Sequence, residues 1–301
     1  MSEPNSPAAA GAVEAPERGP TRLSGLVRRL IAPNPSPFTF TGTCSYILGE
    51  GEVTILDPGP ADPAHIEALL AATHGERVTQ IVITHSHRDH ADGAAPLKAL
   101  TGAPVIGARA YMAKPGAAPR ADAAHALDYR PDEALDDGQR VAGRGFTLET
   151  VATPGHAANH LCFALIEENT LFSGDHVMAW STTVVAPPDG AMGAYMNSLE
   201  KLRGRSETIY WPGHGGPVRD PQRYVRGLIS HRRQREAAIL ARLDTGEANA
   251  MEIAQRVYVG LAPALIGAAS LSTLAHLEDL AQRGLVIGDG SLALETRFRR
   301  A

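Results

Sequence analysis

The stretch that most constrains this chain is residues 81–92, Ile-Val-Ile-Thr-His-Ser-His-Arg-Asp-His-Ala-Asp. Its apolar, β-branched start predicts a strand, and the strand runs into a loop in which four of six residues can bind a metal. These four residues are His85, His87, Asp89 and His90. Holding such groups together away from water is costly unless a cation pairs with them, so the loop predicts a transition-metal site. The alternative is a surface turn that happens to be rich in histidine.

The spacing inside this loop indicates two metal ions. His85 and His87 can turn toward a first ion. Asp89 and His90 lie slightly further along the chain and can turn toward a second ion beside the first. The sequence therefore predicts a dinuclear centre.

Three later segments repeat the pattern of an apolar strand that ends at a metal-binding side chain. His156 follows a Pro-Gly turn, and we expect it to be the third ligand of the first ion. Asp175 is expected to bridge the two ions, because a carboxylate has the charge and the lone pairs to serve both. His214 stands in a glycine-rich turn, where glycines allow close backbone approach, and completes the second ion's ligands.

Four other residues near these loops are not expected to bind the metals. Asp57 ends a strand and either orients a ligand histidine or caps a turn, and the sequence favours neither. His125 lies in an Ala- and Pro-rich insertion, residues 108–131, and is expected to be a bystander because no second donor accompanies it. We expect His160 to form structural hydrogen bonds, and His176 to point away from the centre if its strand continues.

A run of three hydroxyls, Ser181, Thr182 and Thr183, follows soon after the expected bridging carboxylate. These hydroxyls could bind an anionic substrate group such as a phosphate. Hydroxyl runs in loops more often stabilise turns, and this reading is the favoured alternative.

Composition limits the other possibilities for this 301-residue chain. The formal net charge of −5 gives no global cationic field, so a nucleic acid would have to bind through local patches. Cys44 and Cys162 lie in apolar segments and are expected in the core of a protein from a reducing compartment. Residues 1–20 predict a disordered tail, and no stretch is long and apolar enough for a membrane span, so a cytoplasmic location is expected.

The rest of the chain divides into two expected domains. Residues 21–244 alternate strands and helices, among them a strand expected over 38–48 and a helix expected over 91–100. They end in a long helix whose charged run, 231–235, is expected to be solvent-exposed. Residues 245–301 predict a winged helix, with two short strands inside 284–294. Its last helix carries only one arginine, Arg283, so packing or oligomerisation is at least as well supported as DNA binding.

The run at 85–90, followed by His156, Asp175 and His214, resembles the metallo-β-lactamase superfamily over roughly residues 35–220. The resemblance implies an α/β fold, an αββα sandwich, with the ligand sets given above. No cysteine replaces a donor, so the chain resembles the hydrolase branches that keep Asp-His at the second ion.

With the winged helix and the segments 195–199 and 231–236, the chain is similar to β-lactamase-like hydrolases whose animal member is an endoribonuclease on single-stranded RNA. One departure is Cys44, where relatives usually have asparagine; any substrate contact of that asparagine is therefore in doubt.

These features together predict a metallo-hydrolase. A hydroxide bridging two divalent cations would attack the substrate, with Asp89 and Asp175 as catalytic residues. Zinc is the expected metal, with manganese or iron as alternatives. The expected substrate is single-stranded RNA, and the alternative is a small-molecule thioester, ester or lactone, as in glyoxalase II. An iron-dependent persulfide dioxygenase and a non-enzymatic binding module are less favoured, and a homodimer stays open.

Overall fold

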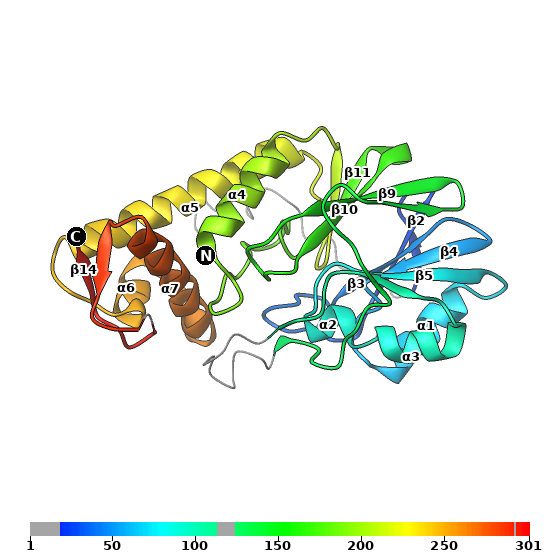
Figure 1. The fold of residues 1–301 in the computed structure, drawn as a ribbon, viewed down its shortest axis with the longest axis horizontal. Helices are drawn as coiled ribbons and strands as arrows, with labels where there is room; N and C mark the ends of the chain where they lie inside the picture. The colour runs from blue at the N-terminus through cyan, green and yellow to red at the C-terminus, as the bar shows by residue number, and fades with distance from the viewer. Residues whose placement is uncertain (1–18, 113–123, 292) are drawn as a thin grey trace.

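The computed structural model describes residues 19–112, 124–291 and 293–301 of the chain. Most of the expected disordered tail, residues 1–18, lies outside the described residues, as does the middle of the expected insertion, residues 113–123. The described part consists of two facing sheets with helices on their outer sides, and a helical arm that extends away from the sheets (Figure 1).

The first half of the chain forms one mixed sheet and the helices that follow its strands. Within the described residues this sheet has seven strands in the order β1-β2-β3-β4-β5-β6-β7. The elements are β1 (Thr21–Arg22), β2 (Val27–Ile31), β3 (Cys44–Leu48), β4 (Glu52–Leu56), α1 (Pro63–Ala72), β5 (Arg77–Ile83), α2 (Arg88–Ala91), α3 (Ala94–Thr101), β6 (Val105–Gly107) and β7 (Glu133–Ala134).

The next part of the chain forms a second sheet and two long helices. In the described residues its strand order is β12-β11-β10-β9-β8. The elements are β8 (Arg140–Gly143), β9 (Phe146–Ala152), β10 (Leu161–Leu165), β11 (Thr170–Gly174), α4 (Met192–Arg203), β12 (Ile209–Pro212) and α5 (Pro221–Leu243).

The layers follow from the two-residue period of the strands. In β3, Tyr46 and Leu48 face the second sheet, whereas Ile47 faces α1 and α3. In β10, Phe163 joins the core between the sheets, and Cys162 packs toward the layer that contains α4 and α5. Because both faces of each central strand are covered, these strands are apolar almost throughout. The expected αββα sandwich is confirmed.

Two details of this half differ from the sequence-based expectation. The strand expected from Phe38 begins only at Cys44, because residues before it form a loop closed by Ser36 and Thr39 hydroxyls. The helix expected over 91–100 is two helices, α2 and α3, separated near Gly93. A Cβ at Gly93 would lie 2.8 Å from the Pro58 carbonyl oxygen, so only glycine allows this close packing.

The C-terminal part forms a small separate core beside the sandwich. Its elements are α6 (Ala250–Val257), α7 (Ile266–Gln282), β13 (Val286–Gly288) and β14 (Phe298–Arg300). An Asn249–Glu252 capping box starts α6. The expected winged helix is confirmed, but its second strand is Phe298–Arg300 rather than a segment within 284–294. Phe298 is fully buried in this core, and that burial fixes the position of the strand.

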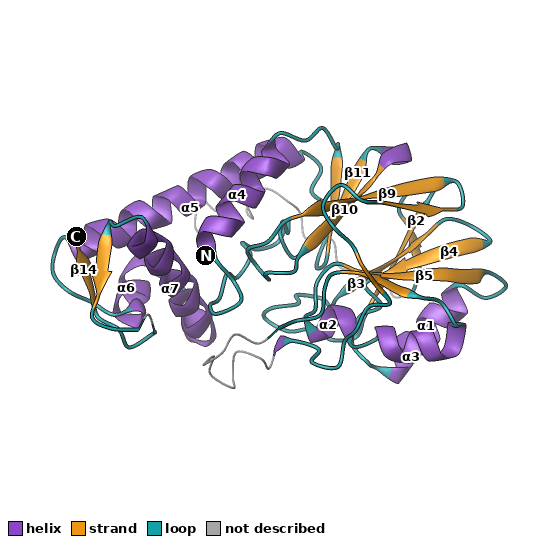
Figure 2. Ribbon diagram, viewed as in Figure 1, coloured by secondary structure: helices purple, strands orange, loops and turns teal. Residues whose placement is uncertain are grey.

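Helix α5 connects the two parts, because its 23 residues reach from the second sheet to the winged helix (Figure 2). The charged run 231–235 is only partly exposed, contrary to expectation: Arg232 is 2% exposed. Both cysteines are buried and unpaired, as expected. Within the ranges that the structure describes, no helix has both the length and the apolar character needed to cross a membrane.

Candidate metal centre

Backbone pairing brings the strand-tip loops to one place. Strands β11 and β12 are parallel, so the loops that carry Asp175 and His214 leave the sheet side by side. Gly213 lies against the Asp175 carboxylate and has no room for a Cβ. The two sheets are also joined at this edge: Leu161 N–H donates to the Thr84 carbonyl at 2.8 Å. The donors therefore converge between the sheets.

The first donor group consists of His85, His87 and His156. His87 Nδ1 lies 3.0 Å from His85 Nε2 and 3.0 Å from His156 Nε2. Tetrahedral nitrogen ligands about 2.1 Å from a zinc ion are themselves about 3.4 Å apart, so this spacing suits a shared cation. Burial lowers the pKa of His85 and of His87 well below the usual value, with further lowering by neighbouring histidines. Both side chains are thus neutral ligands at pH 7.

The second donor group consists of Asp89, His90 and His214. His90 Nε2 and His214 Nε2 are 3.3 Å apart. Asp89 Oδ2 lies 3.3 Å from His214 Nε2 and 3.5 Å from His90 Nε2. These atoms surround one point, as ligands of a single cation would.

Asp175 reaches both donor groups with different oxygens. Its Oδ1 lies 3.4 Å from His90 Nε2 and 3.4 Å from His214 Nε2, whereas Oδ2 lies 3.6 Å from His156 Nε2. Among the described residues, buried Oδ1 has no hydrogen-bond donor of good geometry. An ionised oxygen that is buried in this way needs a positive partner, so the arrangement fits a cation on each side.

The charges of the second group differ from those of the first. Burial alone lowers the pKa of His214, but Asp175 and Asp89 outweigh it and raise that pKa to about 9. The carboxylates likewise raise the pKa of His90 well above its usual value. Burial opposes ionisation of Asp175, yet His214 and His90 hold its pKa well below the usual range. In the metal-free protein, protonated imidazoles therefore pair with the carboxylates, and a cation would replace those protons.

Asp57 orients His90, and this contact decides between the two readings of Asp57. Its Oδ2 lies 2.9 Å from His90 Nδ1 and accepts a 2.7 Å bond from the Thr84 hydroxyl, while Oδ1 accepts from Thr84 N–H. A carboxylate behind a ligand histidine fixes the ring so that Nε2 faces the metal. Asp57 has a φ of 50°, a left-handed conformation that few residues other than glycine, asparagine and aspartate adopt readily.

His160 forms structural hydrogen bonds, as the sequence predicts, and His176 points away from the centre although its strand ends at Gly174. His160 accepts a 3.1 Å bond from the Asp175 N–H at Nε2, and its Nδ1 lies 2.8 Å from the Thr153 hydroxyl. It therefore supports the loop of Asp175. His176 points away into the core, where its ring lies 4.6 Å from that of Tyr195. Burial lowers its pKa to about 3, so this side chain is neutral.

The expectation for His125 needs correction, because other donors do accompany it. His125 is buried, its Nε2 lies 3.5 Å from Asp189 Oδ2, and its ring is 4.7 Å from that of His87. Its Nδ1 lies 3.0 Å from the Ser86 hydroxyl. His87, His125 and Asp189 form a third group of possible metal donors. No local pattern marks Asp189, which follows two prolines in a loop, so sequence reasoning missed it.

The hydroxyl run divides into two parts. Thr183 is buried, and its hydroxyl donates to the Asp175 carbonyl at 2.7 Å, so it stabilises the loop rather than facing a substrate. For Thr183 the contact agrees with the favoured reading, in which the hydroxyl stabilises a turn, and not with the substrate-binding reading. Ser181 and Thr182 are partly exposed, and their contact with a substrate stays a prediction. Trp180, just before them, stacks on Phe40 with ring centroids 5.1 Å apart.

Comparisons with known proteins agree with this geometry. The family model of the metallo-beta-lactamase superfamily matches residues 38–214, and that of the beta-lactamase associated winged helix domain matches residues 250–295. The chain is 33% identical over 270 residues to a beta-lactamase-like protein 2 homolog of Caenorhabditis elegans, covering 88% of this chain and 87% of the relative.

A second relative and a solved structure add to this result. The chain is 34% identical over 228 residues to an atrochrysone carboxyl ACP thioesterase of Aspergillus fumigatus, covering 73% of this chain and 66% of that protein. The crystal structure of a metallo-beta-lactamase family protein from Thermus thermophilus superposes with a TM-score of 0.74 at 26% identity. That match covers 93% of this chain and 100% of the other.

Proposed function

The chain belongs to the metallo-beta-lactamase superfamily, and we propose that it is a dinuclear metal-dependent hydrolase acting on phosphodiester bonds in single-stranded RNA. The observation that carries the dinuclear part is the position of Asp175, whose two oxygens face two separate donor groups. In this proposal His85, His87 and His156 would hold the first cation. Asp89, His90 and His214 would hold the second, and Asp175 would contribute to both sites.

Two divalent cations, when bound, supply an activated water nucleophile near neutral pH and compensate the negative charge that develops on the substrate. Zinc fits the imidazole-rich donor sets, and manganese or iron would fit the same side chains. The chain's own residues have defined tasks. Asp57 fixes the ring of His90, and Thr43 donates its hydroxyl to Asp89 at 3.2 Å, which holds that carboxylate beside the second group.

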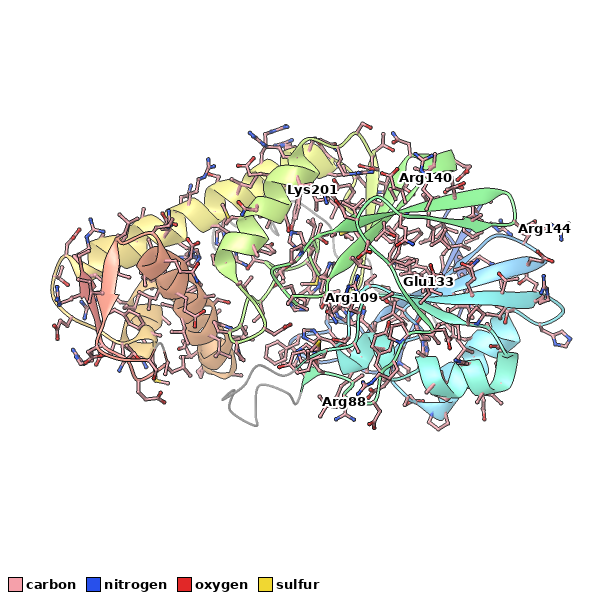
Figure 3. The ribbon with its side chains drawn as sticks, viewed as in Figure 1. Arg88, Arg109, Glu133, Arg140, Arg144 and Lys201 are labelled. Atoms are coloured by element: carbon pink, nitrogen blue, oxygen red, sulfur yellow. The ribbon has the colours of Figure 1, made fainter. Side chains whose placement is uncertain are left out.

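The RNA part rests on the resemblance of both domains to the β-lactamase-like endoribonuclease group. The match to the Caenorhabditis elegans relative spans the catalytic and winged-helix parts together. Two exposed arginines adjoin the metal loops, and each forms a surface ion pair, Arg88 with Asp92 and Arg109 with Asp136. Exposed ion pairs of this kind are weak, so a phosphate of a polyanionic substrate could replace either carboxylate. Arg88 follows His87 directly, and the backbone carbonyl of Arg109 accepts from Asn159, which also contacts Ser86. Figure 3 shows Arg109 toward the middle of the molecule and Arg88, the first residue of α2, near the lower edge of the view.

A thioesterase is the second proposal, and one finding favours it. The Aspergillus fumigatus relative is described as an acyl-carrier-protein thioesterase and is 34% identical to this chain. The same donors would serve a thioester, because a carbonyl oxygen also gains negative charge during hydrolysis.

One pair of assays separates these proposals. Zinc-loaded protein and Asp175→Ala would be incubated with labelled single-stranded RNA and, in parallel, with a glutathione thioester. Metal-dependent RNA cleavage that is absent in Asp175→Ala would support the nuclease.

The RNA proposal also predicts that Arg109→Met raises KM for RNA more than for the thioester, because only RNA is polyanionic. Thioester turnover without RNA cleavage, by protein carrying two metals, would contradict the nuclease and support the thioesterase.

A further inference from the structure

We infer that Arg232 and the winged-helix residue Ser272 position the metal ligand His156 through the loop of residues 181–185. The inference rests on the dinuclear site proposed above and concerns how one of its ligands is held. In this inference the C-terminal domain helps to position a metal ligand, whether or not it also binds a substrate or a partner.

The loop touches His156 at one atom. His156 Nδ1 lies 2.7 Å from the Val184 carbonyl oxygen, so the ring donates a hydrogen bond there and leaves Nε2 toward His87 and Asp175. A backbone carbonyl can orient a ligand ring only if the backbone itself stays in place. The position of Val184 is therefore part of the metal centre.

Contacts from two other helices hold the residues on either side of Val184. The Thr183 carbonyl accepts a hydrogen bond from Arg232 Nη2 on α5. Val185 N–H donates to the Ser272 hydroxyl oxygen on α7 at 3.4 Å. Val185 itself is fully buried in a cluster that also contains Ala275 of α7. Both anchors lie outside the sandwich sheets, and Ser272 belongs to the winged helix.

Arg232 is unusual because it is a charged residue on the buried face of α5, whose other buried residues are apolar. It is 2% exposed, and its guanidinium lies 5.2 Å from the centre of the Tyr195 ring. In the part of the chain that the structure describes, no carboxylate forms an ion pair with it. Burying a cation without a carboxylate is costly. The contacts of the Arg232 guanidinium with the Thr183 carbonyl and the Tyr195 ring offset this cost, and they hold the guanidinium and the carbonyl in place relative to each other.

The same loop also supports the bridging carboxylate from behind. The Thr183 hydroxyl donates to the Asp175 carbonyl, and the Tyr195 hydroxyl donates to the His176 carbonyl at 3.1 Å. These bonds hold the backbone of Asp175, which faces both groups, whereas the Val184 carbonyl contacts only His156 of the first group. We therefore expect loosening of the loop to affect the first ion more than the second.

Metal affinity, measured separately for each ion, tests this inference. Arg232→Met removes the guanidinium and keeps most of the apolar stem, and Arg233→Met is the matched control. Arg233 is the next residue on α5, is exposed, and pairs with Glu200 rather than with the loop. Zinc affinity would be determined by chelator competition in a His214→Ala background, which keeps the first donor group, and in a His87→Ala background, which keeps the second.

The expected result is that Arg232→Met lowers zinc affinity about tenfold at the first group, the lower end of the range for partners behind metal ligands. The second group should change little, and Arg233→Met should match its parent in both backgrounds. Arg232→Lys should recover part of the loss, because an ammonium can still donate to the Thr183 carbonyl. Ser272→Ala should shift affinity in the same direction by a smaller factor.

Equal losses of zinc affinity at both groups would overturn the inference, because they would indicate general destabilisation. Unchanged affinity at the first group would also overturn it. Thermal unfolding of the metal-free variants measures destabilisation directly. If Arg232→Met does not fold, Ser272→Ala decides: a selective loss at the first group supports the inference and no loss contradicts it. None of these affinities depends on the substrate, so failure of the RNA proposal would leave the test intact.

Discussion

The two donor groups of the metal centre are built differently although they lie side by side. The first has three imidazoles, two of which burial keeps neutral, and a backbone carbonyl orients the third. The second contains a carboxylate and two imidazoles whose pKa values are raised, and a carboxylate, Asp57, orients one of them. His85 and His87 of the first group are already neutral and can bind a cation directly, whereas the second group must release protons when a cation binds.

This difference shows how one loop can serve two ions. His85 and His87 are followed at once by Asp89 and His90, so the same short segment supplies both groups. What separates the groups is the charge around them, and much of that charge comes from distant segments, namely Asp57 and Asp175. The first group should therefore be the tighter site at low pH.

The largest expected effect comes from removing the feature that the two groups share. Asp175→Asn keeps the shape of the side chain but removes the charge that faces both groups. We expect hydrolytic activity to fall about a thousandfold, which corresponds to roughly 4 kcal/mol of lost transition-state stabilisation. Activity on whichever substrate the RNA and thioester assays support, together with thermal unfolding of the variant, would measure this. Near-normal activity in a folded Asp175→Asn variant would contradict a catalytic centre in which the two donor groups share the Asp175 carboxylate.

A second prediction concerns the second donor group alone. Asp57→Asn tolerates the left-handed backbone at this position, because asparagine adopts it readily. It can still accept from Thr84 N–H but no longer offers a carboxylate to His90. We expect affinity for the second ion to fall about 10- to 100-fold and the first to change little. Chelator competition would measure both, and an equal fall at both ions would contradict the assignment of Asp57.

A third prediction distinguishes the two groups by their pH dependence. His214 has a pKa of about 9 in the metal-free protein, so its proton must leave when a cation binds below that pH. Affinity at the second group should therefore rise as pH increases toward about 9, by about tenfold per pH unit for each proton displaced. The pKa of His85 lies well below 6.5, so affinity at the first group should be nearly flat above about pH 6.5. Parallel slopes for the two groups would contradict this difference in protonation.

The sequence alone predicted the centre's donors because most of them stand at strand ends. His85, Asp175 and His214 each follow an apolar strand, and parallel neighbours place such loops at one edge. The αββα layers were implied by the resemblance of the ligand motif to the metallo-β-lactamase superfamily. The ligand roles stay predictions that the metal measurements test.

What the sequence did not predict depends on contacts between distant segments. Asp189 reaches His125 only because the loop after Asp175 folds back across the centre. Arg232 looked like one more exposed charge on α5, because nothing local shows that a carbonyl and an aromatic ring from other elements cover it. The sequence pattern predicted the second strand of the winged helix too early in the chain. The burial of Phe298, which fixes that strand, depends on contacts that exist only in the folded domain.

The decisive experiment on the dinuclear centre is to count the metal ions bound by the wild-type protein, His87→Ala and His214→Ala after zinc loading and dialysis. Two donor groups that share only Asp175 predict two ions in the wild type and one in each variant. The ion kept by His214→Ala should be insensitive to pH above about 6.5, and the ion kept by His87→Ala should be lost as pH falls. A single ion in the wild type, or loss of both ions in each variant, would contradict the dinuclear centre.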